Sequence, residues 1–228
     1  MKEILFDKLC ESILQAGAMR KLKMNPQVYE VDRLCKRLTE SNETGIPKKI
    51  IKQFESRTKM HISYVGQYCR KIAKKFPEFE ELNKRAEIHD KSKWKEPERM
   101  PYIWLTLKFK CQNEGGKFED YNPPEDIDAK ITKASEHHVK TNSHHPEFHC
   151  KRKTNLVNKK SRDSKTSQII DATKMPRLDI AEMVADWCGM AKELDDHPKD
   201  WADKNVNKKW KFTDEQKFLI YQLIEAVW

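Results

Sequence analysis

The chain has 228 residues, of which 37% are hydrophobic and 36% are charged. This length can bury one sizeable core, so we expect one domain with a smaller appended segment. Glycine is scarce, and amphipathic runs of Lys, Glu, Leu and Met favour helices over a sheet. No stretch approaches the roughly 18 apolar residues that a membrane span needs. A membrane protein is therefore excluded, and we expect a soluble, cytoplasmic protein.

The six cysteines are scattered, and no two of them form a Cys-x-x-Cys pair. A zinc ribbon needs closer spacing, and a disulfide framework is typical of small secreted chains. We therefore interpret these cysteines as reduced residues that mainly pack. This interpretation agrees with a cytoplasmic location.

The first 45 residues are predicted to form a helical extension. Within them, residues 2–16 and 27–40 have the pattern of two short amphipathic helices, and the run SNETGIP then breaks this pattern. Residues 46–228 are predicted to form the main domain.

A long helix is predicted over residues 48–75. One face of it carries residues at positions i, i+4, i+7 and i+11, namely His61, Val65, Tyr68 and Ile72. Pro77 ends this helix. The next helix is predicted over residues 78–91 and ends near His89 and Asp90.

Three more helices are predicted over residues 99–114, 125–139 and 177–195. The periodicity of the second places His138, rather than His137, toward the core.

The helix over residues 177–195 places Asp186 on its inner face, between Met183 and Met190. A final helix opens at Thr213 with the run TDEQ, which is a capping box. No alternating strand pattern of convincing length is present. The predicted fold is all-α.

Metal-binding residue types recur at four places along the chain. Six of the eight histidines lie in HISYV, EIHDKSKW and EHHVKTNSHHPEF, and an aspartate follows in EMVADW. Hard divalent or trivalent metals bind imidazole nitrogen and carboxylate oxygen in combination. A single histidine on an apolar face is more often a packing residue. Several inward histidines and carboxylates on separate helices would be poorly compensated without a metal, however, so the pattern predicts a metal centre.

The order of these residues resembles the HD-domain superfamily, which consists of helical metal-dependent phosphohydrolases. His61 stands four residues before Val65, and Lys93 stands three residues after Asp90, as in the family's HD-x-x-K. The HHPE run is similar to the double histidine of two-metal members. The resemblance covers about residues 56–195, and it extends to a group of HD-like proteins from phages and bacteria. It implies an HD-domain-like helical bundle.

The resemblance also implies the metal ligands. The residues that match the family's core ligand quartet are His61, His89, Asp90 and Asp186. The second metal is assigned to His138 with His144 or His145, and Asp90 is expected to bridge the two metals. His145 follows His138 by only seven positions, whereas the family usually brings these ligands from different helices. The expected cofactor is one or two ions of Mn, Fe, Co, Ni or Zn.

Two residues beside the ligands join Asp90 as candidate catalytic residues. Lys93 is placed to offset the charge of a substrate phosphate. Glu182, one turn before Asp186, is placed to orient a ligand or a water molecule. A surface position is the alternative for Glu182.

A strongly basic segment is interpreted as a loop inserted over residues 151–170. Its first fifteen residues hold seven Lys or Arg against one Asp, which supplies +6 of the formal net charge of +9. Lys151, Arg152 and Lys153 are candidate phosphate-binding residues that would draw phosphate toward the metal site. A nucleic-acid-binding arm and a solvated insertion without a role are the alternatives.

Together these features predict a metal-dependent phosphohydrolase. The expected substrate is a phosphorylated small molecule, first of all a nucleotide, attacked by a metal-activated water. An HD-type di-iron oxygenase would use the same ligands to activate oxygen. A metal-stabilised nucleic-acid-binding module, acting through the basic loop, is the non-catalytic alternative. No membrane partner is expected.

Overall fold

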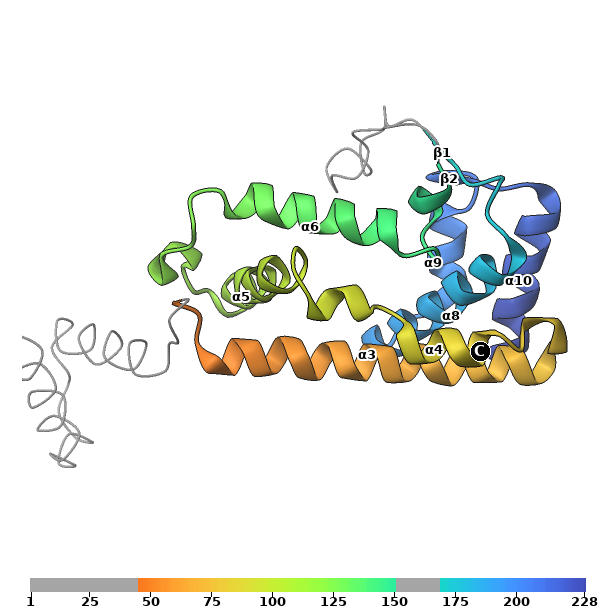
Figure 1. The fold of residues 1–228 in the computed structure, drawn as a ribbon, viewed down its shortest axis with the longest axis horizontal. Coiled ribbons are helices and arrows are strands. Elements are labelled where there is room, and N and C mark those ends of the chain that lie inside the picture. The colour runs from red at the N-terminus through yellow and green to blue at the C-terminus, as the bar shows by residue number, and fades with distance from the viewer. Residues whose placement is uncertain (1–44, 151–168) are drawn as a thin grey trace, which may run out of the picture. The chain divides into compact units, whose positions relative to one another are not determined.

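The computed structural model describes residues 45–150 and 169–228 (Figure 1). The chain divides into two compact units, Met1–Ile51 and Lys52–Trp228. The predicted helical extension lies outside the described residues, except for residue 45. The predicted basic loop also lies outside them, except for its last two residues.

The described part of the chain is mainly helical, which confirms the predicted all-α fold. The α-helices are α3 (Lys48–Lys75), α4 (Leu82–Ile88), α5 (Arg99–Glu114), α6 (Ile127–Thr141), α8 (Arg177–Leu194), α9 (Pro198–Asn205) and α10 (Asp214–Val227). Four short 3-10 helices connect them: η2 (Pro77–Phe79), η3 (Lys91–Trp94), η4 (Phe118–Tyr121) and η5 (Pro146–His149). None of the described helices is long and apolar enough to cross a membrane.

Two strands of two residues each, β1 (Ile170–Asp171) and β2 (Trp210–Lys211), are the only strands in the described ranges. They pair in parallel, with Ile170 opposite Trp210. Ile170 therefore begins a strand, and its assignment to the end of the basic loop is wrong. The pattern of alternating residues that predicts a strand needs more than two residues, so these strands had no detectable signal.

The predicted helix over residues 78–91 is shorter in the structure. It consists of η2 and α4, and α4 ends at Ile88. The two residues after α4 leave helical geometry: His89 has ψ 131°, and the backbone of Asp90 lies in the left-handed region with φ 55°. Aspartate tolerates this conformation better than most residues, but a helix cannot continue through it. The chain turns sharply at this point and enters η3.

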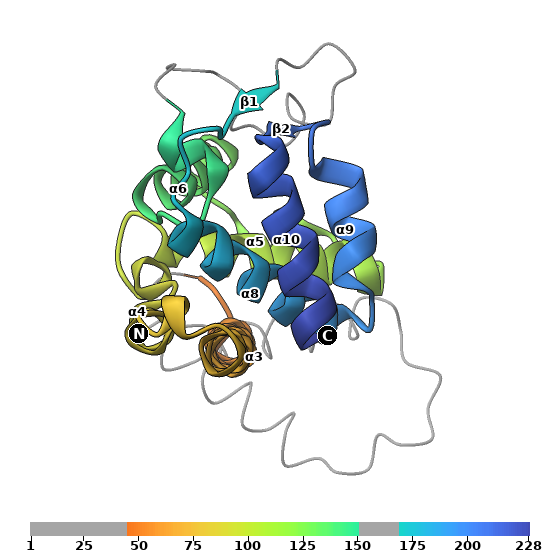
Figure 2. The same cartoon turned by 90° about the vertical axis from the view of Figure 1, so that its right-hand side faces the viewer.

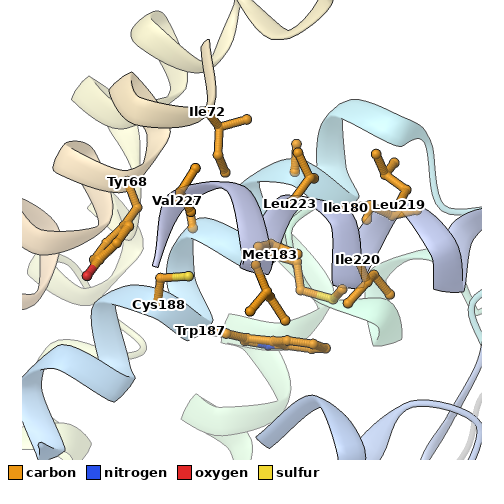
Figure 3. Close-up of a cluster of buried hydrophobic side chains, with 14 of the residues drawn as sticks. Tyr68, Ile72, Ile180, Met183, Trp187, Cys188, Leu219, Ile220, Leu223 and Val227 are labelled. Carbon is orange, nitrogen blue, oxygen red and sulfur yellow. The ribbon is translucent and has the colours of Figure 1, made fainter. Parts of the chain in front are cut away.

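The apolar core lies between α3, α8 and α10 (Figure 3). Ile72 comes from α3, Met183 and Trp187 come from α8, and Leu223 comes from α10. Helix α8 also packs against α4 and α9, and α9 lies beside α10 (Figure 2). Because α8 has neighbours on several sides, most of its surface is buried, and Asp186 on this helix is enclosed by the core elements.

Helices α3 and α8 are in close contact at Val65 and Gly189. A Cβ atom on Gly189 would lie 2.8 Å from Cγ2 of Val65 and 3.1 Å from its backbone nitrogen. A side chain can rotate away from such a contact, but a helix backbone cannot. His61 lies one turn before Val65, and Asp186 lies three residues before Gly189, so this contact also brings two candidate metal ligands together.

We expect Gly189→Ala to lower the free energy of unfolding by about 1–3 kcal/mol, because the added methyl group overpacks the contact between α3 and α8. Urea denaturation followed by circular dichroism measures this change. Gly116→Ala is the matched control, since its Cβ would come no closer than 3.7 Å to Cys111. Equal stabilities of wild type and Gly189→Ala would show that α3 and α8 move apart to accommodate the methyl group without a loss of free energy.

Candidate metal centre

The seven residues predicted as metal ligands lie close together in the structure. They come from α3, from the turn between α4 and η3, from the end of α6 with the loop after it, and from α8: His61, His89, Asp90, His138, His144, His145 and Asp186. The side chains of His145 and Asp186 are partly buried, and the other five residues are buried. The burial of His138 confirms that it, rather than His137, faces the core.

The first group of donor atoms has the spacing of one coordination shell. Nε2 of His61 lies 3.1 Å from Oδ1 of Asp186 and 3.5 Å from Oδ2 of Asp90. Nε2 of His89 lies 3.7 Å from each of the same two oxygens. For metal–ligand bonds of about 2.1 Å, neighbouring donor atoms lie about 3.0–3.4 Å apart and opposite ones about 4.2 Å apart. The observed distances fall near or within this range.

A second group forms around the other oxygen of Asp90. Its Oδ1 lies 3.4 Å from Nε2 of His138 and 3.6 Å from Nε2 of His144. Ligand atoms of His138, His144 and His145 all lie within 4.8 Å of one another. Asp90 thus presents one oxygen to each group, which is the arrangement of a carboxylate that bridges two metals.

Buried polar atoms at this place have no hydrogen-bond partner among the described residues. They include Nε2 of His89, Oδ1 of Asp90 and Nε2 of His145. Buried polar atoms in proteins nearly always have a partner, and each one without a partner costs about 1–3 kcal/mol. Metal ions at the two groups would satisfy all three atoms. The residues present therefore fit a metal better than they fit a purely structural cluster of histidines.

Two buried glutamates form hydrogen bonds with candidate ligands, on the side of each imidazole ring that faces away from the centre. Nδ1 of His89 lies 3.0 Å from Oε1 of Glu182, and Nδ1 of His138 lies 2.9 Å from Oε2 of Glu98. Because an ionised carboxylate only accepts hydrogen bonds, Nδ1 of each imidazole donates to it. In the neutral ring the lone pair of Nε2 then faces the centre. This carboxylate–histidine pairing is typical of protein metal sites.

Glu182 is itself fixed by a basic side chain. Nη1 of Arg85 donates to Oε2 of Glu182 at 3.1 Å, and Arg85 also pairs with Asp179. The alternative of a surface position for Glu182 is wrong, since only 5% of the residue is exposed. Arg85 lies in the last turn of α4, four residues before His89, but nothing in the sequence shows which acid it contacts.

Glu98 was not predicted from the sequence. It is fully buried, and besides His138 it contacts His137 at 2.7 Å and Ser92 at 2.9 Å. In the sequence it stands directly before α5, where an acidic residue is ordinarily explained by the helix dipole. Only the fold, which brings α6 next to α5, gives it histidine partners.

The electrostatics of the cluster separate its members into charged and neutral forms. Burial opposes the charge of Asp90, but Lys93, His89 and His138 outweigh burial and hold the pKa of this carboxyl well below its usual range. Burial also opposes the charge of His89, yet the nearby carboxylates raise its pKa to about 10. Burial and the charge of His89 lower the pKa of His144 to about 4.

Lys93 lies on the wall of a cavity of about 270 Å³ that reaches the centre. Its side chain is 23% exposed, and its Nζ lies 2.5 Å from Oδ2 of Asp90. Burial opposes its charge, but the Asp90 carboxylate raises the pKa of the ammonium group, which therefore stays protonated. His61 and His138 line the same cavity. The other predicted phosphate-binding residues, Lys151, Arg152 and Lys153, lie outside the described residues.

A family model matches residues 50–226 of the chain. The chain belongs to this family of unknown function, DUF5662. Comparison with curated proteins and with solved structures gave no match. The range matched by DUF5662 includes every candidate metal ligand, but membership of this family does not indicate an activity. Any function must therefore be argued from the site itself.

We expect Asp90→Asn to lose bound metal, because the amide cannot serve as an anionic oxygen ligand for both groups. Asparagine has the same shape and also tolerates left-handed backbone, so the fold should be retained. Elemental analysis of purified wild type should find Mn, Fe, Co, Ni or Zn, and the variant should contain almost none. Full metal content in Asp90→Asn would contradict the assignment of this residue.

Glu98→Gln should weaken metal binding by about 10–100-fold, the usual effect of removing a group that orients a ligand. His137 and His138 contact different oxygens of Glu98, and in glutamine an NH2 donor replaces one of them, so only one histidine keeps its acceptor. Competition with a chelator measures the metal affinity, and Glu87→Gln, at an exposed position on α4, is the matched control. Equal affinities of the two variants would mean that Glu98 does not orient His138.

Proposed function

We propose that the protein is a metal-dependent phosphohydrolase of the HD type that acts on a phosphate ester. One observation carries the proposal: Asp90 offers one carboxylate oxygen to each of two histidine groups, and Lys93 lies beside it on a cavity wall. When bound, metal ions at such a centre polarise a phosphoryl oxygen and lower the pKa of a bound water.

The residues of the chain have distinct tasks in this proposal. Glu182 and Glu98 orient His89 and His138, so that Nε2 of each ring points toward the centre. Lys93 offers a compact positive charge, which suits a phosphate oxygen.

The cavity beside Lys93 has further groups that suit an anion. Arg57, Thr58 and Thr106 contribute to its lining, together with apolar side chains. Glu193 also lines it and pairs with Arg57, which offsets part of that positive charge. Recognition of phosphate would therefore depend on Lys93, the hydroxyl groups and the metals.

A di-iron oxygenase is the second candidate, because the same histidine and carboxylate ligands are suitable for iron. Five histidines and two carboxylates around a shared Asp90 also suit two iron ions. The two functions predict different metals and different co-substrates. An iron-loaded protein that consumes oxygen and hydrolyses no phosphate ester would replace the first proposal with the second.

The sharpest test of the hydrolase uses Lys93→Ala. This variant should keep its metal and its fold, but the rate should fall roughly ten- to a hundredfold, as expected for the loss of one charge-assisted contact worth about 1.5–3 kcal/mol. The assay measures phosphate release from nucleotides, cyclic dinucleotides and simple phosphate monoesters, with Mn²⁺ or Co²⁺ present.

Lys91→Ala is the matched control, since Lys91 is an exposed lysine in the same 3-10 helix. It should hydrolyse the substrate as fast as wild type. Equal rates for wild type and Lys93→Ala would remove Lys93 from the site, and no hydrolysis by metal-loaded wild type would contradict the proposal.

A further inference from the structure

A second cavity, of about 180 Å³, also reaches the metal centre. His145 and Asp186, which are candidate ligands, form part of its wall. Met190 lines both this cavity and the one beside Lys93. A substrate bound with its phosphate at the centre could therefore extend another group into this second cavity.

Three tryptophans dominate the second cavity: Trp187, Trp201 and Trp210. The rings of Trp187 and Trp210 stack with centroids 5.8 Å apart, and both residues are buried. Trp201, on α9, is 46% exposed and so has free surface. Nε1 of Trp210 donates to Oε1 of Glu147 at 3.2 Å, which fixes this ring next to the HHPE run. The aromatic wall is thus attached to the loop that carries His145.

The charged groups of this cavity are acidic. Its described lining includes Glu147, Asp196 and the candidate metal ligand Asp186. This described lining also includes the imidazoles of His145 and His197, but no lysine or arginine. Aromatic faces combined with carboxylates attract cations.

We propose that the second cavity binds a methylated ammonium group. The aliphatic side chains of Met190, Ala191 and Leu194 and the tryptophan rings give the cavity an apolar wall that suits the methyl groups of such a cation, and the carboxylates suit its charge. Combined with the proposed phosphohydrolase function, on which this step rests, the substrate is a phosphate ester that also carries a quaternary ammonium group. The binding of the cation itself does not depend on hydrolysis.

The first test measures binding of free choline to the full-length protein by calorimetry. Its neutral isostere, 3,3-dimethylbutan-1-ol, has the same shape without the charge and should bind at least about fivefold more weakly. Trp201→Ala should weaken choline binding by a similar factor, whereas Trp201→Phe should retain most of it. Phe218→Ala is the matched control, because Phe218 is 69% exposed and lies outside the cavity lining.

Equal binding of choline and the neutral isostere would overturn the proposal, as would binding of adenosine or guanosine in place of choline. Unchanged choline affinity in Trp201→Ala would also overturn it. The metal-poor Asp90→Asn variant separates this proposal from the proposed function, because it should still bind choline.

A second measurement connects the cavity to the reaction. With phosphocholine as substrate, Trp201→Ala should raise KM by at least about fivefold and leave kcat unchanged, while KM for glycerol phosphate should stay the same. If wild type binds choline but hydrolyses no ester, the hydrolase proposal fails and the cation site remains. If it hydrolyses esters without a preference for phosphocholine, the cation proposal fails alone.

Discussion

The buried carboxylate of Asp90 is the group on which the rest of the site depends. Only 1% of this residue is exposed, and a buried charge is tolerated only when other groups compensate it. Its partners come from η3, α3, α6 and the loop after α6, through Lys93, His61, His138 and His144. Its backbone also lies in the left-handed region, within the sharp turn that follows the end of α4.

The two groups of candidate ligands are supported in different ways. His61 and Asp186 stand on α3 and α8, whose contact at Gly189 and Val65 belongs to the apolar core. His144 and His145, in contrast, lie on the loop between α6 and η5. Sites on packed helices are held more accurately than sites on loops. His61 and Asp186 are therefore positioned by the core, while the positions of His144 and His145 depend on a loop and on the metal.

Local periodicity explains what could be predicted from the sequence. The buried face of α3, the inward direction of His138 and the capping box at Thr213 follow from residues close together in the chain, and the structure confirms all three. Glu98 and the cavity around Trp201 depend on segments that meet only in the fold, so no local pattern could indicate them. Helix α9 is short and starts at Pro198, which gave too little periodicity to detect it.

The two groups of candidate ligands differ in the protonation of their histidines, and therefore in how strongly protons compete with a metal. The carboxylates raise the pKa values of His61 and His89, so a metal that binds there must displace protons from these rings. His144 and His145 have lowered pKa values and are already neutral at pH 7. Protons therefore compete with metal at the first group far more than at these two residues of the second. The shared Asp90 stays ionised in either case, so acid weakens metal binding mainly through His61 and His89.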